Sequence, residues 1–502
     1  MKSIYRKLKY SGMAAIALTM LAAVTLLAGV SIPAQAQTYT PLFTFSGDPQ
    51  WFANPAGSLA LGRDGNFYGM TMGGAVPEFY VITPSGAPTK LWTGNGIGWQ
   101  CFSPTTNSGF TVGPDGLLYG VCWEVDWNQD NAGAVIKFDP SQGQNGVTVL
   151  YKFPYGGGCS VQPNSLTLNT DGNFYGTTYG GNCGNAGMGT FFKITPSGTY
   201  KLLHTFQGVY GNPQDASYPS AITLGNDGNF YGTSWNGGNT GYNTGTVFKI
   251  TPKGKVTLLY SFQQKSATDP YNPGAPLTQG ADGKWYGTTW QGGAYQYYGT
   301  IFQLVKAGTI KVLHSFNMNV DNAAYPVFPL TLGTDRNFYS PSQDTAFGGY
   351  GPESIFEITT GKKNVYTDLF NWLLPGQDCN NQLMNGCFPG SPLAAHPNGM
   401  FYGTTESGAY PADEGVFYSF NVGFKPYIVP QFPLGKKGTS VGIFGVGLIG
   451  TSGVYFNGVS AQFTVDSDTY LTATIPTGAT TGYLTVATPS GTLKSATKFK
   501  VK

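Results

Sequence analysis

The chain has 502 residues, of which 41% are hydrophobic, 15% aromatic and only 10% charged. Residues 1–36 contain four basic and no acidic residues, so 23 basic and 25 acidic residues remain after them. A nearly neutral surface excludes nucleic acid and anionic membranes as natural partners and favours neutral polar ligands.

The first 36 residues have the pattern of a signal peptide. They open with four basic residues, Lys2, Arg6, Lys7 and Lys9. An apolar run from Ala14 to Val30 follows, and Ala34-Gln-Ala36 provides a small-x-small cleavage site. An uncleaved membrane anchor is the alternative, but the run is short for a spanning helix. We expect a secreted or cell-surface protein with no stable membrane insertion after cleavage.

One phrase recurs seven times between residues 64 and 403. Its full form is Asp-Gly-Asn-Phe-Tyr-Gly, and its copies begin at Asp64, Asp115, Asp171, Asp227, Asp282, Asp335 and Asn398. The tyrosines of successive copies lie roughly 51 to 63 residues apart, which is at or just above the upper end for solenoids and propellers. In the sixth copy Arg336 replaces the turn glycine and Ser340 replaces the final glycine.

Each repeat predicts four short strands. In the unit from Ala221 to Phe262 the apolar runs are 221–224, 229–234, 246–251 and 256–262, all rich in β-branched and aromatic residues. Asp227-Gly228 between the first two runs supplies the positive φ of a tight hairpin, and Pro252-Lys-Gly254 marks a second turn. No helical period competes with this pattern in the repeats.

Four antiparallel strands in each of seven units predict an all-β fold, a seven-bladed β-propeller over residues 37–424. The last unit has a third strand at 415–420 but no fourth, and Tyr39–Phe45 resembles a fourth strand. We therefore expect this N-terminal strand to complete the last blade and close the ring, which removes exposed edges. A solenoid of long hairpins is the alternative, and it would need polar capping repeats.

Six cysteines in an exported chain suggest disulfides. Their positions before the first strand, after the second strand or within one long loop predict three pairs, Cys101–Cys122, Cys159–Cys183 and Cys379–Cys387. None of the spacings resembles a zinc or redox motif.

The long links between strands all emerge on one face of the predicted propeller, where function usually lies. These loops carry six aromatic residues that we take as candidate ligand contacts, Trp99, Trp123, Trp127, Trp235, Tyr242 and Trp290. Flat rings beside amide and hydroxyl groups suit sugar rings. The alternative is that the rings only pack over the glycine-rich loops.

Calcium is the one cofactor that the sequence suggests. Asp126, Asn128 and Asp130 occupy positions 1, 3 and 5 of a calcium loop. Asn131 stands where such a loop requires glycine, and Lys137 stands where it requires glutamate. A plain polar loop is the alternative reading, and otherwise we expect no cofactor.

Other polar residues favour structural roles. His204 and His314 occupy positions that are tyrosine in sister repeats, which predicts packing. Asp215 and Asp321 precede Tyr-Pro pairs, and they are interpreted either as loop caps or as carboxylates for acid–base chemistry. Gly438-Thr-Ser-Val-Gly442 matches G-x-S-x-G but lacks the strand–turn–helix context of a nucleophile elbow.

Residues 425–502 lie beyond the repeats and predict a small β-sandwich. Its candidate strands are Ser440–Phe444, Gly453–Phe456, Leu471–Ile475 and Tyr483–Ala487. The stretches 438–448, 454–459 and 468–476 resemble an IPT/TIG domain of immunoglobulin-like fold. That resemblance implies a spacer or adhesive unit of extracellular proteins.

The repeat phrase, with Gly-Gly after it and Gly-Thr-Val-Phe-Lys-Ile-Thr further on, resembles the Gloeo_Verruco tandem repeat over residues 39–423. The resemblance implies a bacterial exported propeller and brings no established activity with it.

Three functions remain open at this point. We expect a monomeric binding protein whose partner is a polysaccharide or a surface protein. A glycoside hydrolase or polysaccharide lyase on the loop-bearing face is the second reading, and a spacer without ligand is the third. The candidate residues recur from repeat to repeat, whereas a catalytic site needs residues that occur once. This recurrence favours a binding protein over an enzyme.

Overall fold

The computed structural model describes residues 37–45, 54–71, 77–94, 101–102, 108–124, 131–154, 161–180, 188–208, 215–238, 243–318, 320–321, 323–343, 353–361, 363–373, 386–408 and 414–502. The predicted signal peptide lies outside these residues. The described chain is all-β and contains one short 3₁₀ helix, η1 (Pro140–Asn145). Within these ranges no helix has both the length and the hydropathy to cross a membrane.

The described residues up to 424 form seven antiparallel sheets, numbered here in chain order. Sheet 1 consists of β2 (Pro55–Leu61), β3 (Phe67–Thr71), β4 (Glu78–Ile82) and β5 (Pro88–Thr93). Sheet 2 consists of β6 (Cys101–Phe102), β7 (Thr111–Val112), β8 (Leu118–Glu124), β9 (Asn131–Phe138) and β10 (Val147–Pro154). Sheet 3 consists of β11 (Pro163–Leu168), β12 (Phe174–Thr178), β13 (Thr190–Ile194) and β14 (Tyr200–Thr205).

Sheet 4 consists of β15 (Ala216–Leu224), β16 (Phe230–Gly237), β17 (Thr246–Ile250) and β18 (Val256–Ser261). Sheet 5 consists of β19 (Thr278–Gln279), β20 (Trp285–Thr289), β21 (Thr300–Lys306) and β22 (Thr309–Ser315). Sheet 6 consists of β23 (Thr331–Leu332), β24 (Phe338–Pro341), β25 (Glu353–Ile358) and β26 (Tyr366–Leu373).

Sheet 7 joins the two ends of the repeat region. It consists of β27 (Cys387–Pro389), β28 (Ala394–Ala395), β29 (Phe401–Ser407), β30 (Val416–Asn421) and β1 (Thr38–Thr44). The N-terminal strand β1 runs antiparallel to β30, with Thr38 opposite Asn421 and Thr44 opposite Val416. The seventh sheet therefore takes its outer strand from the start of the chain, as the sequence predicts.

The repeat phrase forms and stabilises the first hairpin turn at one end of each sheet. Its glycine takes the positive φ of the turn, for example +85° at Gly228. Its tyrosine hydroxyl donates to the carboxylate of the aspartate four residues earlier, in Tyr68–Asp64 (3.0 Å), Tyr119–Asp115 (2.7 Å), Tyr175–Asp171 (2.9 Å), Tyr231–Asp227 (2.9 Å), Tyr286–Asp282 (3.0 Å) and Tyr339–Asp335 (2.8 Å). In sheet 7 the Asn398 amide donates to the Tyr402 hydroxyl at 2.8 Å. These local bonds fix the hairpin of the first two strands.

Hydrogen bonds also connect each sheet to the next. In five junctions a threonine hydroxyl donates to a main-chain oxygen of the following sheet, in Thr111–Leu166 (2.7 Å), Thr167–Ile222 (2.6 Å), Thr223–Leu277 (2.7 Å), Thr278–Leu330 (2.5 Å) and Thr331–Leu393 (2.8 Å). Between sheets 1 and 2, Ser58 N–H donates to Ser108 O at 2.8 Å. Between sheets 7 and 1, Gly57 N–H donates to Gly390 O at 2.9 Å. Each described sheet thus contacts two neighbours.

Apolar side chains fill the space between neighbouring sheets. One such core joins Phe191 of sheet 3 to Phe230 and Phe248 of sheet 4, and all three are fully buried. A glycine before the third strand lets neighbouring segments approach closely: a Cβ on Gly245 would lie 2.4 Å from Ser234 O and 2.7 Å from Cδ of Pro273, which precedes the first strand of sheet 5. Burial on both sheet faces explains why apolar residues are adjacent in the sequence.

Residues 425–502 form a separate set of strands around their own core. One sheet contains β31 (Val429–Pro430), β33 (Ser440–Phe444), β37 (Tyr470–Thr474) and β36 (Phe463–Val465). A second sheet contains β35 (Val459–Ala461), β34 (Gly453–Phe456), β38 (Leu484–Thr488) and β39 (Gly491–Lys494). A parallel pair is formed by β32 (Leu434–Gly435) and β40 (Lys500–Val501). Buried residues of both sheets, among them Ile443, Leu471 and Val486, share one apolar cluster.

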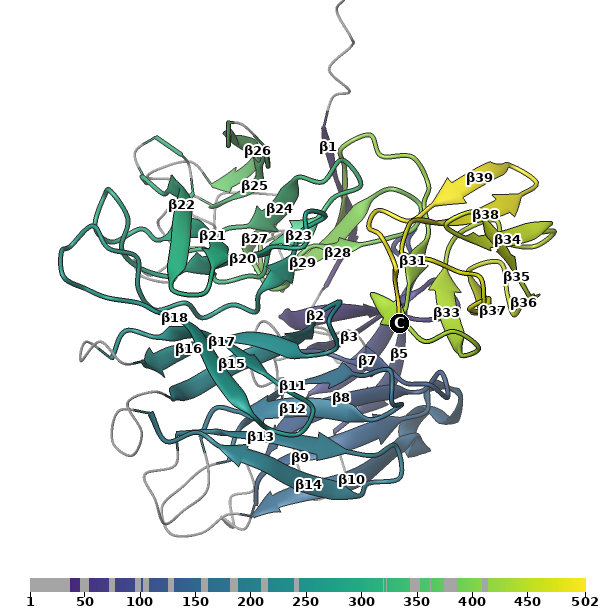
Figure 1. Ribbon diagram of the computed structural model, residues 1–502, viewed down its shortest axis with the longest axis horizontal. Helices are drawn as coiled ribbons and strands as arrows, with labels where there is room; N and C mark the ends of the chain where they lie inside the picture. Colours follow the sequence, from purple (N-terminus) through teal and green to yellow (C-terminus); the bar gives the residue numbers. More distant parts are fainter. Residues whose placement is uncertain are drawn as a thin grey trace, which may run out of the picture.

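This C-terminal unit packs against the hairpin turns of the repeat sheets. Figure 1 shows its yellow strands gathered at one side, while the purple to green sheets fill the rest of the view. Thr469 Oγ1 donates to Arg63 O at 2.6 Å, and the Arg63 guanidinium lies 4.6 Å from the centre of the Tyr470 ring. Lys502 Nζ donates to Asp227 O at 3.1 Å. Leu434 is part of the buried core of sheets 3 and 4.

Candidate functional site

The repeat sheets have two faces, which differ in the links between strands that lie on them. The tight turns after the first and third strands of each sheet lie on one face, which we call the turn face, and the C-terminal unit covers part of it. The links between second and third strands lie on the opposite face, which we call the loop face. Any ligand site built from the long links therefore lies away from the C-terminal unit.

Three equivalent aromatic residues stand where the second strand reaches the loop face. Tyr179, Trp235 and Trp290 each lie four residues after the repeat tyrosine, in sheets 3, 4 and 5. Because the repeat fixes the strand register, the three residues occupy the same position in successive sheets. The Trp235 and Trp290 ring centres are 5.6 Å apart at an interplanar angle of 40°.

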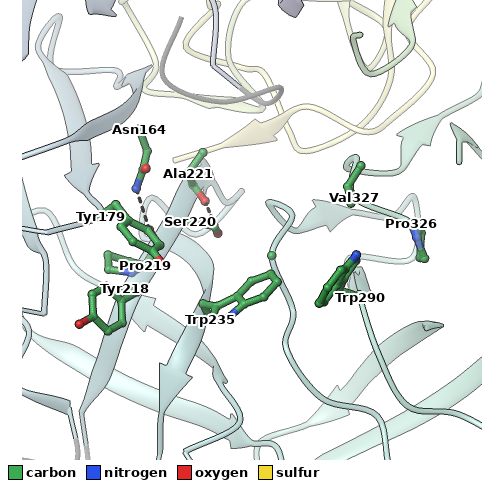
Figure 2. Close-up of a pocket in the computed structure, with 11 residues that line it drawn as sticks. Asn164, Tyr179, Tyr218, Pro219, Ser220, Ala221, Trp235, Trp290, Pro326 and Val327 are labelled. Carbon is green, nitrogen blue, oxygen red and sulfur yellow. Dashed lines mark hydrogen bonds between the residues drawn. The ribbon is translucent and has the colours of Figure 1, made fainter. Parts of the chain in front are cut away.

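A cavity of about 200 Å³ lies beside these rings. Figure 2 shows Tyr179, Tyr218 and Pro219 on its left, Trp235 at the bottom, and Trp290, Pro326 and Val327 on its right. Its remaining lining residues are Asn164, Ser220, Ala221 and Gly274. None of the eleven residues carries a charge. Such a lining suits an uncharged ligand with one flat apolar face.

The polar groups at the cavity are already positioned by the sheets. Asn164 Nδ2 donates to Pro219 O at 2.7 Å and to Thr177 Oγ1 at 3.1 Å. Ser220 Oγ lies 2.8 Å from Thr233 Oγ1. Burial, together with the neighbouring Tyr218, raises the pKa of Tyr179 above its usual value. The Tyr179 hydroxyl is therefore neutral at physiological pH and can donate a hydrogen bond.

Two tyrosines near the cavity have strained backbones. Tyr218 has a φ of +53° and Tyr325 a φ of +50°, each immediately before a proline. The equivalent positions in sheets 1 and 5 are Asn54 and Asn272, and asparagine adopts this region more easily. The Tyr218 ring centre lies 4.9 Å from that of Tyr179. Phe388 of sheet 7 also has a positive φ, +54°, before a proline, so this strain belongs to the repeat and does not mark the cavity.

Ring-to-ring packing continues from the cavity into sheet 6 and a loop of sheet 5 through Tyr325, which is itself buried with 4% of its surface exposed. Trp290 and Tyr325 have ring centres 5.7 Å apart, and Tyr325 and Tyr298 have ring centres 6.0 Å apart. Tyr325 N–H donates to Tyr298 O at 3.0 Å, which fixes the loop against sheet 6. Beyond it, Tyr295 and Tyr297 are 51% and 56% exposed.

Sheets 6 and 7 carry polar residues at the position of these aromatics. Gln343 is the equivalent residue in sheet 6, and Glu406 is the equivalent residue in sheet 7. Burial raises the pKa of Glu406 to about 7. With its amide oriented to donate, Asn54 lies 2.8 Å from the main-chain oxygen of Glu406 and 3.3 Å from Oε2 of Glu414. The loop face is therefore aromatic on one side and polar on the other.

The structure brings together two of the six aromatic residues predicted as ligand contacts, Trp235 and Trp290. Trp99, Trp127 and Tyr242 lie outside the described residues, and only the backbone of Trp123 is described, in β8. The predicted calcium ligands Asp126, Asn128 and Asp130 also lie outside them. Within the described ranges no group of three His, Cys, Asp or Glu side chains is arranged to hold a metal ion.

The structure describes the side chains of two of the six cysteines for which we predicted disulfides. Cys122 and Cys387 are each disulfide-bonded. Cys159, Cys183 and Cys379 and the side chain of Cys101 lie outside the described residues. The three predicted pairings therefore stay predictions.

The aspartates before the Tyr-Pro pairs cap loops. Asp215 accepts from the main-chain N–H groups of Gln207 and Ala216 at 3.1 and 2.8 Å, and His204 Nε2 lies 3.0 Å from its carboxylate. Asp321 repeats this arrangement with the N–H of Asn317 and with His314 at 2.9 Å. Both histidines lie on outer strands, so these pairs support a structural role.

The G-x-S-x-G match has no catalytic context. Ser440 begins the strand β33, and Gly442 continues it opposite Thr472. No sharp strand-to-helix turn presents the serine hydroxyl.

Sequence reasoning missed six aromatic residues at or beside this cavity, Tyr179, Tyr218, Tyr295, Tyr297, Tyr298 and Tyr325. The repeated Tyr-Pro pair was a usable signal for Tyr218 and Tyr325. For Tyr179 the signal was its equivalence to Trp235 and Trp290 in the repeat register.

Solved structures with a similar arrangement have low sequence identity. An oligogalacturonate lyase from Vibrio parahaemolyticus is 10% identical with a TM-score of 0.46, covering 77% of this chain and 97% of that chain. A protein of unknown function from Bacteroides thetaiotaomicron is 15% identical with a TM-score of 0.37, covering 61% of this chain and 72% of that chain. Likenesses at this level carry no argument about function.

A comparison with curated proteins finds no match. The Gloeobacter/Verrucomicrobia repeat matches four overlapping segments, residues 29–217, 78–297, 162–382 and 218–467. Since these segments together span most of the sequence, the chain belongs to the Gloeobacter/Verrucomicrobia repeat family.

Proposed function

We propose that this protein is an exported glycan-binding protein whose ligand lies on the aromatic loop face of a closed seven-bladed β-propeller. One observation carries the proposal: Trp235 and Trp290 line an uncharged cavity together with Tyr179 and Tyr218. Aromatic faces beside amide and hydroxyl groups match the apolar faces and the hydroxyl groups of sugars. A charged ligand would find no counter-charge among these lining residues.

The sheet contacts support the closed propeller. Each of the seven described sheets contacts two others by hydrogen bonds, and sheet 7 meets sheet 1 through Gly57 and Gly390. The strand β1 completes sheet 7 from the far end of the repeat region. Such an arrangement has no open end that would require a capping repeat.

The C-terminal unit is proposed to be an immunoglobulin-like sandwich of the IPT/TIG type. Its two four-stranded sheets around one apolar cluster support this assignment. Its several contacts with the turn face favour a fixed position over a loose spacer.

Affinity electrophoresis of residues 37–502 in gels containing neutral plant, fungal or bacterial polysaccharides tests the proposed function. We expect retention by at least one neutral polysaccharide and loss of most retention in Trp235→Ala and Trp290→Ala. Tyr455→Ala, in the C-terminal unit, serves as the control and should be retained like the wild type. Absence of retention, or equal retention of all variants, contradicts glycan binding at this cavity and leaves a protein partner or a spacer role.

A carbohydrate-active enzyme is the second candidate, favoured by Glu406. A carboxyl group with a pKa of about 7 is suited to act as a general acid at neutral pH. The same polysaccharides, assayed for new reducing or unsaturated ends, separate the two functions. Product formation that is lost in Glu406→Gln would establish the enzyme, whereas retention without product supports the binding protein.

A further inference from the structure

We infer that the cavity beside Trp235 and Trp290 binds the acetamido group of an N-acetylated sugar, and that the Asn164 amide oxygen accepts the N–H of this group. The inference rests on the proposed glycan-binding function and specifies the class of sugar. An acetamido group is flat and uncharged, and it combines one N–H donor, one carbonyl acceptor and one methyl group.

The first argument is the fixed orientation of the Asn164 amide. Asn164 lies on the strand β11 of sheet 3 and is only 4% exposed. Its Nδ2 donates to Pro219 O at 2.7 Å and to Thr177 Oγ1 at 3.1 Å, and Thr177 Oγ1 in turn donates to Ser220 O at 2.7 Å. Because Pro219 O can only accept, the nitrogen and the oxygen of the amide are not interchangeable. Figure 2 shows this amide beside Tyr179, with its nitrogen in a hydrogen bond. Both amide hydrogens are used within the protein, so the amide can only accept from a ligand.

The second argument is that the oxygen of this amide is left for a ligand. Asn164 lines the cavity, and among the described residues no N–H or O–H group donates to its Oδ1. An acceptor on so deeply buried a residue has little access to bulk water, so a donor inside the cavity stabilises it. A ligand that places an N–H at this point supplies the bond, whereas a ligand without a donor there leaves the oxygen unpaired.

The third argument is that this acceptor occurs once. In four successive sheets the residue that follows the loop-face proline lines the cavity, and these residues are Asn164, Ser220, Gly274 and Val327. The hydroxyl of Ser220 already lies 2.8 Å from Thr233 Oγ1 of its own sheet, and the other two side chains are not polar. Among the eleven lining residues only Asn164 has a side-chain carbonyl group. The cavity therefore fixes one donor of the ligand at one defined place.

The fourth argument is the chemistry of the remaining walls. Beside the aromatic rings, four lining residues are apolar, namely Pro219, Ala221, Pro326 and Val327. An unsubstituted hexose carries hydroxyl groups around its ring, and several of them would lose water against these walls without gaining a partner. An acetamido group instead places its methyl group on the apolar residues, which removes apolar surface from water.

The cavity also provides for the carbonyl of the acetamido group and for the size of the sugar. The hydroxyl groups of Tyr179 and Tyr218 stand at the cavity, and within the described part of the chain neither has a hydrogen-bond partner. Either hydroxyl can donate to the ligand carbonyl. The cavity of about 200 Å³ is smaller than the roughly 300–1,000 Å³ that is usual for drug-sized ligands, so it holds one substituted sugar unit.

Isothermal titration of residues 37–502 with three disaccharides tests the inference. Chitobiose, cellobiose and the fully deacetylated form of chitobiose share one skeleton and differ at the second carbon, which carries an acetamido, a hydroxyl or an ammonium group. We expect the Kd of chitobiose to be at least tenfold below the other two. Cellobiose lacks the methyl group, and the ammonium group would lose its water in a cavity without a carboxylate.

Two variants separate a ligand contact from a structural effect. Asn164→Ala removes the acceptor and should reduce the preference for chitobiose over cellobiose to less than threefold. A merely structural loss would weaken the binding of both sugars equally and keep the preference. Thr177→Val is the matched control, because it removes one bond of the same buried network and keeps the acceptor, so its preference should stay within threefold of the wild type. If Asn164→Ala does not fold, the comparison of the three sugars on the wild type still decides.

Chitin and the glycan of bacterial cell walls both carry acetamido groups. The disaccharide of N-acetylglucosamine and N-acetylmuramic acid, titrated beside chitobiose, distinguishes these two sources. The lactyl carboxylate of the muramic acid finds no counter-charge among the lining residues, so we expect it to bind more weakly than chitobiose. Tighter binding of this disaccharide would support the acetamido group and assign the ligand to cell walls.

The outcomes distinguish this inference from the function on which it rests. Equal affinity for chitobiose and cellobiose, with loss of both in Trp235→Ala, keeps the glycan site and overturns the acetamido group. A full preference for chitobiose in a folded Asn164→Ala overturns the assignment of Asn164 as its acceptor. No binding of any of these sugars, together with no retention in the polysaccharide gels, overturns both the inference and the proposed function.

Discussion

The Arg336 guanidinium donates a 2.8 Å hydrogen bond to the Tyr483 hydroxyl, across the boundary between sheet 6 and the C-terminal unit. Arg336 has a φ of +73°, in a turn where the six sister copies carry glycine. A strained arginine thus takes the place of a relaxed glycine and makes a contact that glycine cannot make.

The first prediction compares two replacements of Arg336. Arg336→Ala loses the bond to Tyr483 and keeps the backbone strain, so the free energy of unfolding should fall by about 1 kcal/mol. Arg336→Gly loses the same bond but relieves strain of about 1 kcal/mol, so it should be nearly neutral. Urea denaturation measures both. Equal destabilisation by the two replacements would contradict the role of strain.

Arg63 should contribute more than Arg336 to the free energy of unfolding, because it lies in the first turn of sheet 1 and contacts both sheet 2 and the C-terminal unit. Its guanidinium donates to Gly113 O and Pro114 O of sheet 2 at 3.2 and 2.8 Å and lies over the Tyr470 ring. Arg63→Ala should lower the free energy of unfolding by roughly 2 kcal/mol. Arg63→Lys keeps the charge without the planar fork and should recover less than half of that loss. Full recovery by lysine would show that only charge matters.

A pair of glycines tests how closely neighbouring segments approach. Gly245→Ala introduces a Cβ 2.4 Å from a main-chain oxygen at a φ of +99°, and it should cost about 3 kcal/mol or more. Gly283→Ala is the control, since its φ is +79° and no other atom lies within 4 Å of the added carbon. There only the backbone strain of about 1 kcal/mol should appear. Thermal unfolding of the two variants gives the comparison.

Glu406 should make stability depend on pH. Its pKa is about 7 in the folded protein because burial disfavours the carboxylate, and it is 4.5 ordinarily. The folded state therefore holds more protons than the unfolded state between these values, and the free energy of unfolding should decrease as the pH rises from about 4.5 to 7. Because the group is partly exposed, we expect a loss of roughly 1–3 kcal/mol.

Glu406→Gln removes the titrating group and should flatten this part of the stability curve. Denaturation at pH 5 and pH 8 measures the change for both proteins. If the difference between the two pH values is the same in wild type and variant, Glu406 does not titrate as described.

The strands were largely predictable because each is a short apolar run bounded by turn residues. Ser440–Phe444 and Gly453–Phe456 were predicted with the bounds that β33 and β34 have. The strand β15 begins at Ala216, five residues before the predicted start at Ala221. Tyr218-Pro219 resembles a loop in sequence, yet Pro219 still pairs with Ser234 across the sheet.

The site was predictable only in part, because the sequence around a single aromatic residue does not show where its side chain points. Trp235 and Trp290 stood out as tryptophans in glycine-rich loops, whereas Tyr179 is one of 32 tyrosines. The contact between Trp290 and Tyr325 depends on how sheet 5 meets sheet 6, which no local pattern specifies. The same holds for the docking of the C-terminal unit, where Arg63 and Tyr470 are far apart in sequence.

The bond between the repeat tyrosine and its aspartate lies within one hairpin and involves no residue of the long loops. One end of every sheet is thus independent of what happens at the other end. A new loop between the second and third strands can lengthen or change its residues while the hairpin stays folded. Successive copies of one repeat could in this way diverge into different surfaces, aromatic in sheets 3 to 5 and polar in sheets 6 and 7, on an unchanged frame.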